Sequence, residues 1–124
     1  MNIMIVDDEP QVAEVLAKSL GRQGHKTTVV HSGEEALRMI NIATPDALFL
    51  DVSMPGINGL EVLAEVRRTR PQLAVVVITG QATPDEVEQV KKLGAVDVIP
   101  KPAALKHYHN AIERLHTNQS ANQS

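Results

Sequence analysis

The stretch Ile3-Met4-Ile5-Val6-Asp7-Asp8 begins with an unbroken apolar run of strand length and ends abruptly in two acidic residues. An apolar run without polar alternation is typical of a strand that is covered on both faces, as in a parallel sheet. Between Pro10 and Gly24, apolar residues recur at the spacing of an amphipathic helix, with the proline near the first turn and the glycine after the last. The residues of this apolar stripe are Val12, Val15, Leu16 and Leu20.

The same unit of a strand and a helix recurs four more times. Later strands are expected in apolar or β-branched stretches, at residues 27–30, 47–50, 74–78 and 96–99. Ser32 with Glu35, and Thr83 with Glu86, form capping boxes that predict the starts of two helices. Five such units predict the α/β class, with a single doubly wound five-stranded parallel sheet and five helices on its two faces.

Length and composition limit the kind of protein. A chain of 124 residues fits one domain, which we expect to cover residues 1–117, followed by a disordered polar tail at residues 118–124. The net charge of −3 and the scattered basic residues argue against direct binding of nucleic acid. No apolar run approaches the roughly 20 residues of a membrane span. Cysteine is absent, which fits a reducing compartment, so we expect a cytoplasmic protein.

Polar residues stand directly after the expected strands. They are Asp7 and Asp8 after the first, Asp51 after the third, Thr79 after the fourth and Lys101 after the fifth. In an open α/β sheet, ligands bind outside the carboxyl ends of the strands, so these side chains are expected to converge. Three carboxylates in one crevice repel one another unless a cation is present, and Mg²⁺ prefers such oxygen ligands. An ionised aspartate in this setting is suited to accept a phosphoryl group.

Each of these residues taken alone also has a structural interpretation. Asp7 and Asp8 can cap a helix, Asp51 and Thr79 can start turns, and most lysines are solvated surface charges. Their joint placement at one edge of one sheet favours the functional interpretation. A second possible metal pair, His107 and His109, is assigned no ligand role, because residues two apart on a helix point in different directions.

Four motifs together resemble those of response-regulator receiver domains. They are Val6-Asp7-Asp8-Glu9, the stretch from Asp51 through Val52-Ser53-Met54-Pro55-Gly56-Ile57-Asn58 to Gly59, Ile78-Thr79-Gly80, and Lys101-Pro102. The resemblance covers nearly the whole chain in order. It implies a flavodoxin-like strand order of 2-1-3-4-5 and a cis Lys101-Pro102 peptide.

The resemblance also implies a role for each site residue. Asp51 would be the phosphoacceptor, and Asp8 and Asp51 would ligate Mg²⁺ with the backbone carbonyl of Ser53. Asp7 would hold the ion through water. Lys101 would pair with the phosphoryl oxygens, and Thr79 would donate its hydroxyl to the phosphoryl group.

The implied partners are proteins. A sensor histidine kinase or a phosphotransfer protein would donate the phosphoryl group, with acetyl phosphate as a small substitute. The phosphorylated chain would then bind a downstream protein target or form a phosphorylation-dependent dimer.

Two departures from the family motifs concern how phosphorylation would change the interaction surface. Val98 stands where the family usually has Tyr or Phe, so the resemblance does not imply the usual coupling of Thr79 to the output face, which is formed by the fourth helix, the fifth strand and the fifth helix. Pro100 precedes Lys101, fits an edge strand and is hypothesised to make that face less mobile.

Three other functions are alternatives for this sequence. The chain can be an excised receiver of a longer regulator. It can be an aspartyl-phosphate phosphatase or phosphotransferase, but such enzymes typically place a second acid two residues after the nucleophile, where this chain has Ser53. It can be a phosphorylation-independent adaptor, but such variants usually lose one of the acids or the lysine. We therefore expect a signalling switch that is not an enzyme beyond its own phosphorylation and autodephosphorylation.

Overall fold

The computed structural model describes residues 1–53, 59–81 and 83–123, with only the backbone described for 116–123. Strands and helices alternate along the chain as β1 (Asn2–Val6), α1 (Pro10–Arg22), β2 (Lys26–Val30), α2 (Gly33–Ile42), β3 (Ala47–Asp51), α3 (Gly59–Thr69), β4 (Ala74–Thr79), α4 (Pro84–Lys92), β5 (Asp97–Pro100) and α5 (Leu105–Gln123). The five expected units are thereby confirmed. Residues 54–58, which belong to the motif between Asp51 and Gly59, lie outside the described residues.

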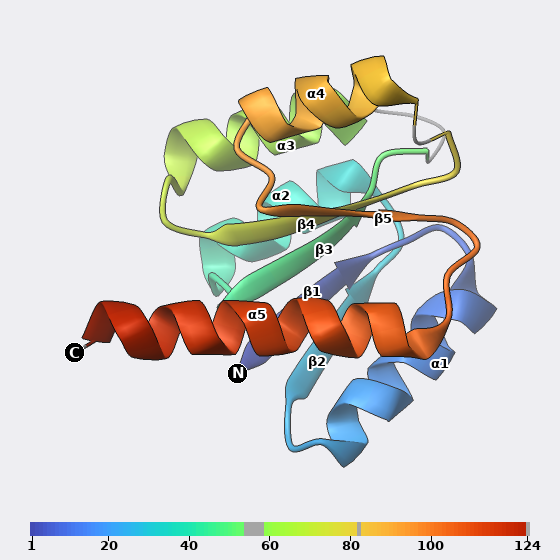
Figure 1. Ribbon diagram of the computed structural model, residues 1–124, viewed down its shortest axis with the longest axis vertical. Coiled ribbons are helices and arrows are strands. Elements are labelled where there is room, and N and C mark those ends of the chain that lie inside the picture. Colours follow the sequence, from blue (N-terminus) through green and yellow to red (C-terminus); the bar gives the residue numbers. More distant parts are fainter. Residues whose placement is uncertain (54–58, 82, 124) are drawn as a thin grey trace.

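The strands form one parallel sheet in the order β2-β1-β3-β4-β5, as the resemblance implied (Figure 1). The two central strands, β1 and β3, pair with Val6 opposite Leu50. On the other side of β3, Asp51 lies opposite Ile78 of β4. Because all strands run in the same direction, the residues that follow them gather at one edge of the sheet.

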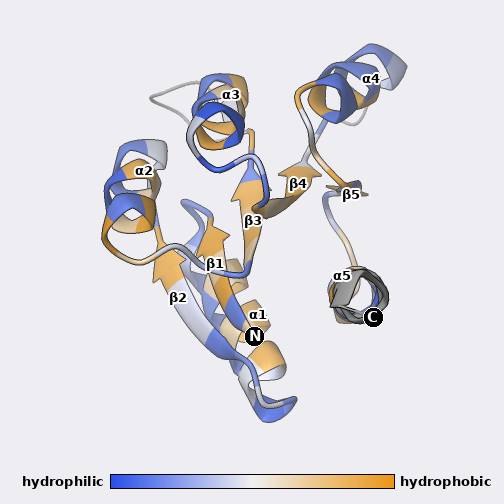
Figure 2. Ribbon diagram, turned by 90° about the vertical axis from the view of Figure 1, so that its left-hand side faces the viewer, coloured by the Kyte–Doolittle hydropathy of each residue, from blue (hydrophilic) through white to orange (hydrophobic). Residues whose placement is uncertain are grey.

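The strands are continuously apolar because both faces of the sheet are covered (Figure 2). Met4 and Val6 pack in a core with residues of α2, α3 and α4, whereas Ile3 and Ile5 pack in a second core with residues of α1 and α5. In the second core, Phe49 of β3 meets Tyr108 of α5 edge to face, with ring centroids 5.7 Å apart. Tyr108 is buried in this core.

The helix starts follow the capping signals of the sequence. The Ser32 hydroxyl accepts a hydrogen bond from the Glu35 N–H (3.1 Å), and the Thr83 hydroxyl accepts one from the Glu86 N–H (3.2 Å). Gly24 follows α1 with a φ of 90°, a left-handed conformation that favours glycine. Local signals therefore determine where these elements begin and end.

One expectation about the buried face of α1 differs from the structure. The apolar spacing predicts that Val12 and Val15 belong to the buried stripe of α1, but they are 39% and 54% exposed, because the face that packs on the sheet is formed by Ala13, Leu16 and Leu20. The helix α5 runs from Leu105 to Gln123, and the polar tail expected at 118–124 stays a prediction. The domain boundary at residue 117 stays a prediction. Among the described residues, no helix combines the length and the apolar character needed to cross a membrane.

Replacing Gly59 with Ala is expected to lower the free energy of unfolding by about 2 kcal/mol, because overpacking of a buried site is destabilising. Gly59 is buried at the start of α3, and a Cβ atom there would overlap the Cα atom of Val52. The matched control is Gly21→Ala in α1, where an added Cβ meets nothing within 4 Å. That control should stabilise the helix by about 0.5–1 kcal/mol. Urea unfolding measures both; equal stability of the two variants would refute the packing argument.

Candidate functional site

The site is built on the carboxyl ends of the central strands. Asp7 directly follows β1, Asp51 is the last residue of β3, and Thr79 is the last residue of β4. These three are the buried polar or charged residues of the described chain, with exposed fractions of 2%, 1% and 1%. Burying polar groups is costly unless they are paired or used, so their concentration at one sheet edge marks this edge as the candidate site.

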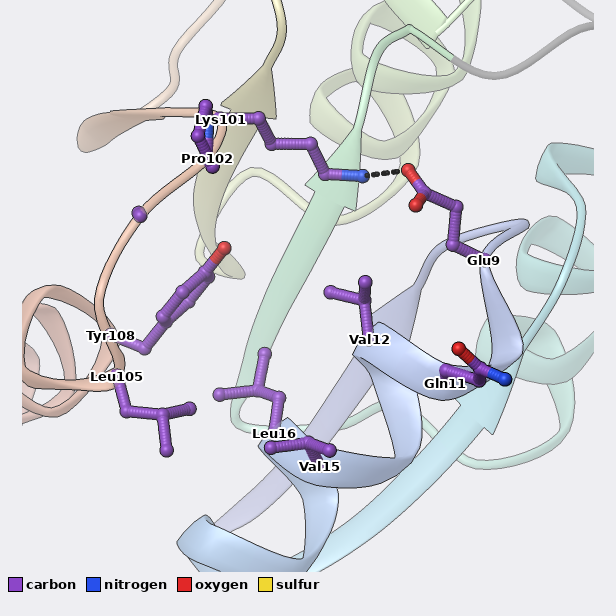
Figure 3. Close-up of a pocket in the computed structure, with 10 residues that line it drawn as sticks. Glu9, Gln11, Val12, Val15, Leu16, Lys101, Pro102, Leu105 and Tyr108 are labelled. Carbon is purple, nitrogen blue, oxygen red and sulfur yellow. Dashed lines mark hydrogen bonds and ion pairs between the residues drawn. The ribbon is translucent and has the colours of Figure 1, made fainter.

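Lys101 extends from the end of β5 into this group of acids. Its Nζ atom lies 2.6 Å from Oδ2 of Asp51, 3.1 Å from Oδ2 of Asp7 and 3.1 Å from Oε1 of Glu9. Figure 3 shows the lysine side chain reaching across the edge of the sheet to Glu9, above an apolar groove between α1 and α5. One ammonium group therefore pairs with three carboxylates.

The backbone around Lys101 fixes its approach. Pro100 has no N–H but still pairs in register with Thr79 of β4, and the Lys101 N–H donates to the carbonyl of Thr79 (2.7 Å). The peptide between Lys101 and Pro102 is cis, as the resemblance implied. The lysine is thus anchored to the strand that carries Thr79.

Backbone donors hold the two buried carboxylates in place. The N–H of Ser53 donates to Oδ1 of Asp51 (2.7 Å), which leaves Oδ2 to the lysine. The N–H of Glu9 donates to Oδ1 of Asp7 (2.9 Å). The Asp51 side chain is therefore oriented by one loop N–H and one ammonium group, as a fixed nucleophile requires.

Carboxylates outnumber cations at this edge. Oxygen atoms of Asp7, Asp8, Glu9 and Asp51 all lie within 4.8 Å of one another, so four acids face the single ammonium of Lys101. Burial raises the pKa of Asp7 above its ordinary value, and the Glu9 N–H and Lys101 offset this only in part. Hard oxygen donors with excess negative charge are the ligand chemistry that Mg²⁺ prefers, so the residues present fit such an ion.

The protonation state of Lys101 follows from the same contacts. Burial lowers its pKa, but the hydrogen bonds to Asp51, Glu9 and Asp7 outweigh this effect and raise the pKa above its ordinary value. The ammonium group therefore keeps its charge throughout the neutral range. A permanent cation beside Asp51 is suited to stabilise negative charge that arrives there.

Thr79 and Ser53 link the site to the segment after β4. The Thr79 hydroxyl donates to the carboxylate of Glu86 in α4 and accepts from the N–H of Gln81 (3.1 Å). The Ser53 hydroxyl accepts from the N–H of Gly80 (3.0 Å). The loop after Asp51 and the loop after β4 are thus joined across the site.

The sequence identified most of this site but not all of it. Asp7, Asp8, Asp51 and Lys101 are brought together as expected. The family resemblance implies no role for Glu9. Its position directly after Asp7 and Asp8 in the sequence was nevertheless a signal that it could join the site. The bond between Thr79 and Glu86 was not foreseen, because the capping pattern assigned Glu86 to its own helix.

In the presence of a chelator, Asp7→Asn is expected to be more stable than the wild type at pH 7. The folded protein holds the Asp7 proton more tightly than the unfolded chain does, so the stability of the wild type falls as pH rises from about 4 through the raised pKa. Asn removes this cost, and the difference between the two proteins should vanish below about pH 4. Urea unfolding at several pH values measures it. A variant that is less stable at pH 7 would show that burial does not dominate.

The family described as the response regulator receiver domain matches this chain over residues 3–113. Among curated relatives, response regulator MprA of Mycobacterium avium is 42% identical over 106 residues, which make up 86% of this chain and 46% of MprA. The chain therefore spans about half the length of this relative.

Solved structures agree with the observed fold. A CheY-like response regulator receiver domain protein from Methanospirillum hungatei has a TM-score of 0.90 over 97% of both chains, and its 23% identity makes this a likeness of fold. Response regulator protein TrrA from Thermotoga maritima, solved in complex with Mg²⁺-BeF, has a TM-score of 0.82 at 28% identity and covers 92% of this chain and 97% of TrrA.

Proposed function

The chain belongs to the response regulator receiver domain family, and from this premise we propose that it accepts a phosphoryl group on Asp51 and thereby switches a protein-interaction surface. The observation that carries this proposal is the buried carboxylate of Asp51, held by the Ser53 N–H on one oxygen and by Lys101 on the other. A buried carboxylate that is fixed in this way, at the ligand-binding edge of an α/β sheet, is suited to nucleophilic attack.

In the proposed reaction, a carboxylate oxygen of Asp51 forms a bond to phosphorus while the bond between phosphorus and the leaving group breaks. The electron pair of the broken bond leaves with acetate when acetyl phosphate is the donor, and with the imidazole nitrogen when the donor is a phosphohistidine. A carboxylate attacks through an oxygen that carries no proton, so this step needs no separate base. Lys101, which lies 2.6 Å from Asp51, would pair with the arriving phosphoryl oxygens.

We propose that Asp8 and Asp51 ligate Mg²⁺ with the Ser53 carbonyl, and that Asp7 holds the ion through water. When bound, the ion would neutralise the charge of the acids and of the incoming phosphoryl group. The clustered oxygens of Asp7, Asp8 and Asp51 support this proposal, as does the Mg²⁺-BeF complex of TrrA. The Thr79 hydroxyl would then donate to the phosphoryl group.

The proposed donor is a sensor histidine kinase or a phosphotransfer protein in the cytoplasm, and the proposed reader is a downstream protein or a second copy of the phosphorylated chain. A second candidate is that this receiver serves a longer regulator. The length of MprA, of which the chain covers 46%, favours it. Catalytic turnover of other phosphoesters is not part of the proposal, because Ser53 stands where a leaving-group acid would be needed.

Intact mass after incubation with acetyl phosphate tests the proposal. We expect the mass of one phosphoryl group to be gained in the presence of Mg²⁺, and no gain when the chelator EDTA is present. A gain of equal size in EDTA would argue against the ion. Sustained hydrolysis of small phosphoesters would instead support the phosphatase alternative.

A further inference from the structure

The Thr79 hydroxyl is already fully engaged before any phosphoryl group is present. It donates its single proton to the Glu86 carboxylate and accepts from the N–H of Gln81 (3.1 Å). A hydroxyl has one proton to donate, so Thr79 cannot donate to Glu86 and to a phosphoryl oxygen at the same time. Donation to a phosphoryl group on Asp51 therefore requires that the bond to Glu86 breaks.

The role of Glu86 as a helix cap does not account for this bond. In a full capping box, the Glu86 side chain would accept from the N–H of Thr83. Here the Thr83 N–H donates to the carbonyl of Gln81 (2.6 Å), and only the Thr83 hydroxyl serves the helix, by accepting from the Glu86 N–H. The Glu86 carboxylate is thus diverted from its own helix to the end of β4.

The next donor along the chain is engaged in the same way. The Gly80 N–H donates to the hydroxyl of Ser53, on the loop that follows Asp51 (3.0 Å). Two consecutive donors, the Thr79 hydroxyl at the end of β4 and the Gly80 N–H directly after it, are therefore committed to acceptors other than a ligand at Asp51. The segment that would respond to phosphorylation is held in a defined starting conformation.

The negative charge of the phosphoryl group would also favour breaking the bond between Thr79 and Glu86. A phosphoryl group adds about −1.5 to −2 charge, and it would arrive beside the hydroxyl that Glu86 accepts from. Like charges at short range repel, so the Glu86 carboxylate would be driven away from β4 as the group arrives. Glu86 lies in the first turn of α4, which would move with it.

The helix α4 packs on the rest of the protein through little buried side-chain surface, so it can move when Glu86 is displaced. Val90 is its one buried residue. On the neighbouring strand β5, the partly buried Val98 stands where the family usually has Tyr or Phe, the residue that usually couples Thr79 to the output face. A direct bond from Thr79 to α4 supplies a coupling that does not need that aromatic ring.

We propose that Glu86 is a positioning residue that holds the Thr79 hydroxyl in the unphosphorylated protein, and that phosphorylation of Asp51 exchanges this bond for one to the phosphoryl group and releases the first turn of α4. The inference rests on the proposed function of Asp51. It assigns the transmission of the signal to the contact between Thr79 and Glu86.

The first test compares the rates at which variants gain a phosphoryl group from acetyl phosphate in Mg²⁺. Because only molecules with a free Thr79 hydroxyl would react efficiently, Glu86→Ala should raise the rate about fivefold. The matched control is Glu88→Ala, which removes an exposed acid of the same helix that pairs with Lys92 (3.1 Å) and should leave the rate unchanged. In a Thr79→Ala background, adding Glu86→Ala should change nothing further. Equal acceleration with and without the threonine hydroxyl would overturn the proposal, because charge alone would then explain the effect.

The second test needs no phosphorylation and so separates the two proposals. Hydrogen exchange of the backbone amides of α4 should be faster in Thr79→Ala and in Glu86→Ala than in the wild type, and the double variant should add little to either. Unchanged exchange in Thr79→Ala would refute the contact as a restraint on α4, whatever the outcome for Asp51. Failure of the wild type to gain a phosphoryl group, with the exchange result as expected, would refute the function of Asp51 and the release step while leaving the restraint in place.

Discussion

Replacement of Asp51 by Asn is expected to abolish the gain of a phosphoryl group from acetyl phosphate in Mg²⁺. The amide has no negative oxygen to attack phosphorus, and it is a poor ligand for a hard cation compared with a carboxylate. The backbone around the residue would remain, because the N–H of Ser53 can donate to the amide oxygen as it does to Oδ1. The loss should therefore be chemical rather than structural.

A matched control separates these two causes. Asp46→Asn changes another aspartate next to the same strand, but at the opposite edge of the sheet, where its Oδ2 accepts from the N–H of Asn2 (2.7 Å). An Asn oxygen can replace that acceptor, so this variant should gain the same mass as the wild type. A mass gain that persists in Asp51→Asn would remove Asp51 from the proposed role.

Replacement of Lys101 by Met is expected to lower the free energy of unfolding in EDTA by about 2–3 kcal/mol, because buried carboxylates lose their cation. Asp7 and Asp51 are almost fully buried, and each lies within 3.1 Å of the lysine Nζ atom. Met preserves most of the apolar stem, so the loss reports mainly the charge. Added Mg²⁺ should recover part of it, since a divalent cation can replace the missing positive charge among the acids.

The control for this effect is Lys18→Met, which breaks an exposed pair with Glu14 on α1 (3.2 Å). Exposed pairs contribute little, so its stability should stay within about 0.5 kcal/mol of the wild type, with the same response to Mg²⁺. Urea unfolding with EDTA or Mg²⁺ measures all three proteins. Equal losses in the two lysine variants would mean that the acids at the sheet edge do not depend on Lys101.

The fold was largely predictable because its signals are local and redundant. The run from Ile3 to Val6 has no polar residue, and the structure buries it between two layers of helices. The strand order was a different matter: nothing in the periodicity of the chain specifies it, and it came from the family resemblance before the pairing of β1 with both β2 and β3 confirmed it.

The convergence of Asp7, Asp51 and Lys101 was predictable for a topological reason. Parallel strands end at the same edge of a sheet, so residues that follow different strands become neighbours in space. The same rule cannot say which way a side chain points after the strand ends. Glu9 turns toward Lys101, which is far away in the sequence, and Glu86 turns toward Thr79 at the end of the preceding strand; the strand topology determines neither orientation.

The exposure of Val12 and Val15 has a related cause. Helical spacing predicts that residues share a face, but not how wide a part of that face the sheet covers. In α1, Ala13, Leu16 and Leu20 are the buried residues, while Val12 and Val15 lie beside this face and line the groove toward α5 shown in Figure 3. A periodic pattern therefore overestimated the buried part of this helix.

The most direct test of the central claim is to locate the phosphoryl group on the chain. After incubation with acetyl phosphate and Mg²⁺, borohydride reduction converts an aspartyl phosphate to homoserine, which tandem mass spectrometry of peptides can place at a single residue. We predict homoserine at position 51, in place of Asp51, in the wild type and in Glu86→Ala. Homoserine at another aspartate, or a phosphoryl group on a serine, threonine or histidine with Asp51 intact, would contradict the account.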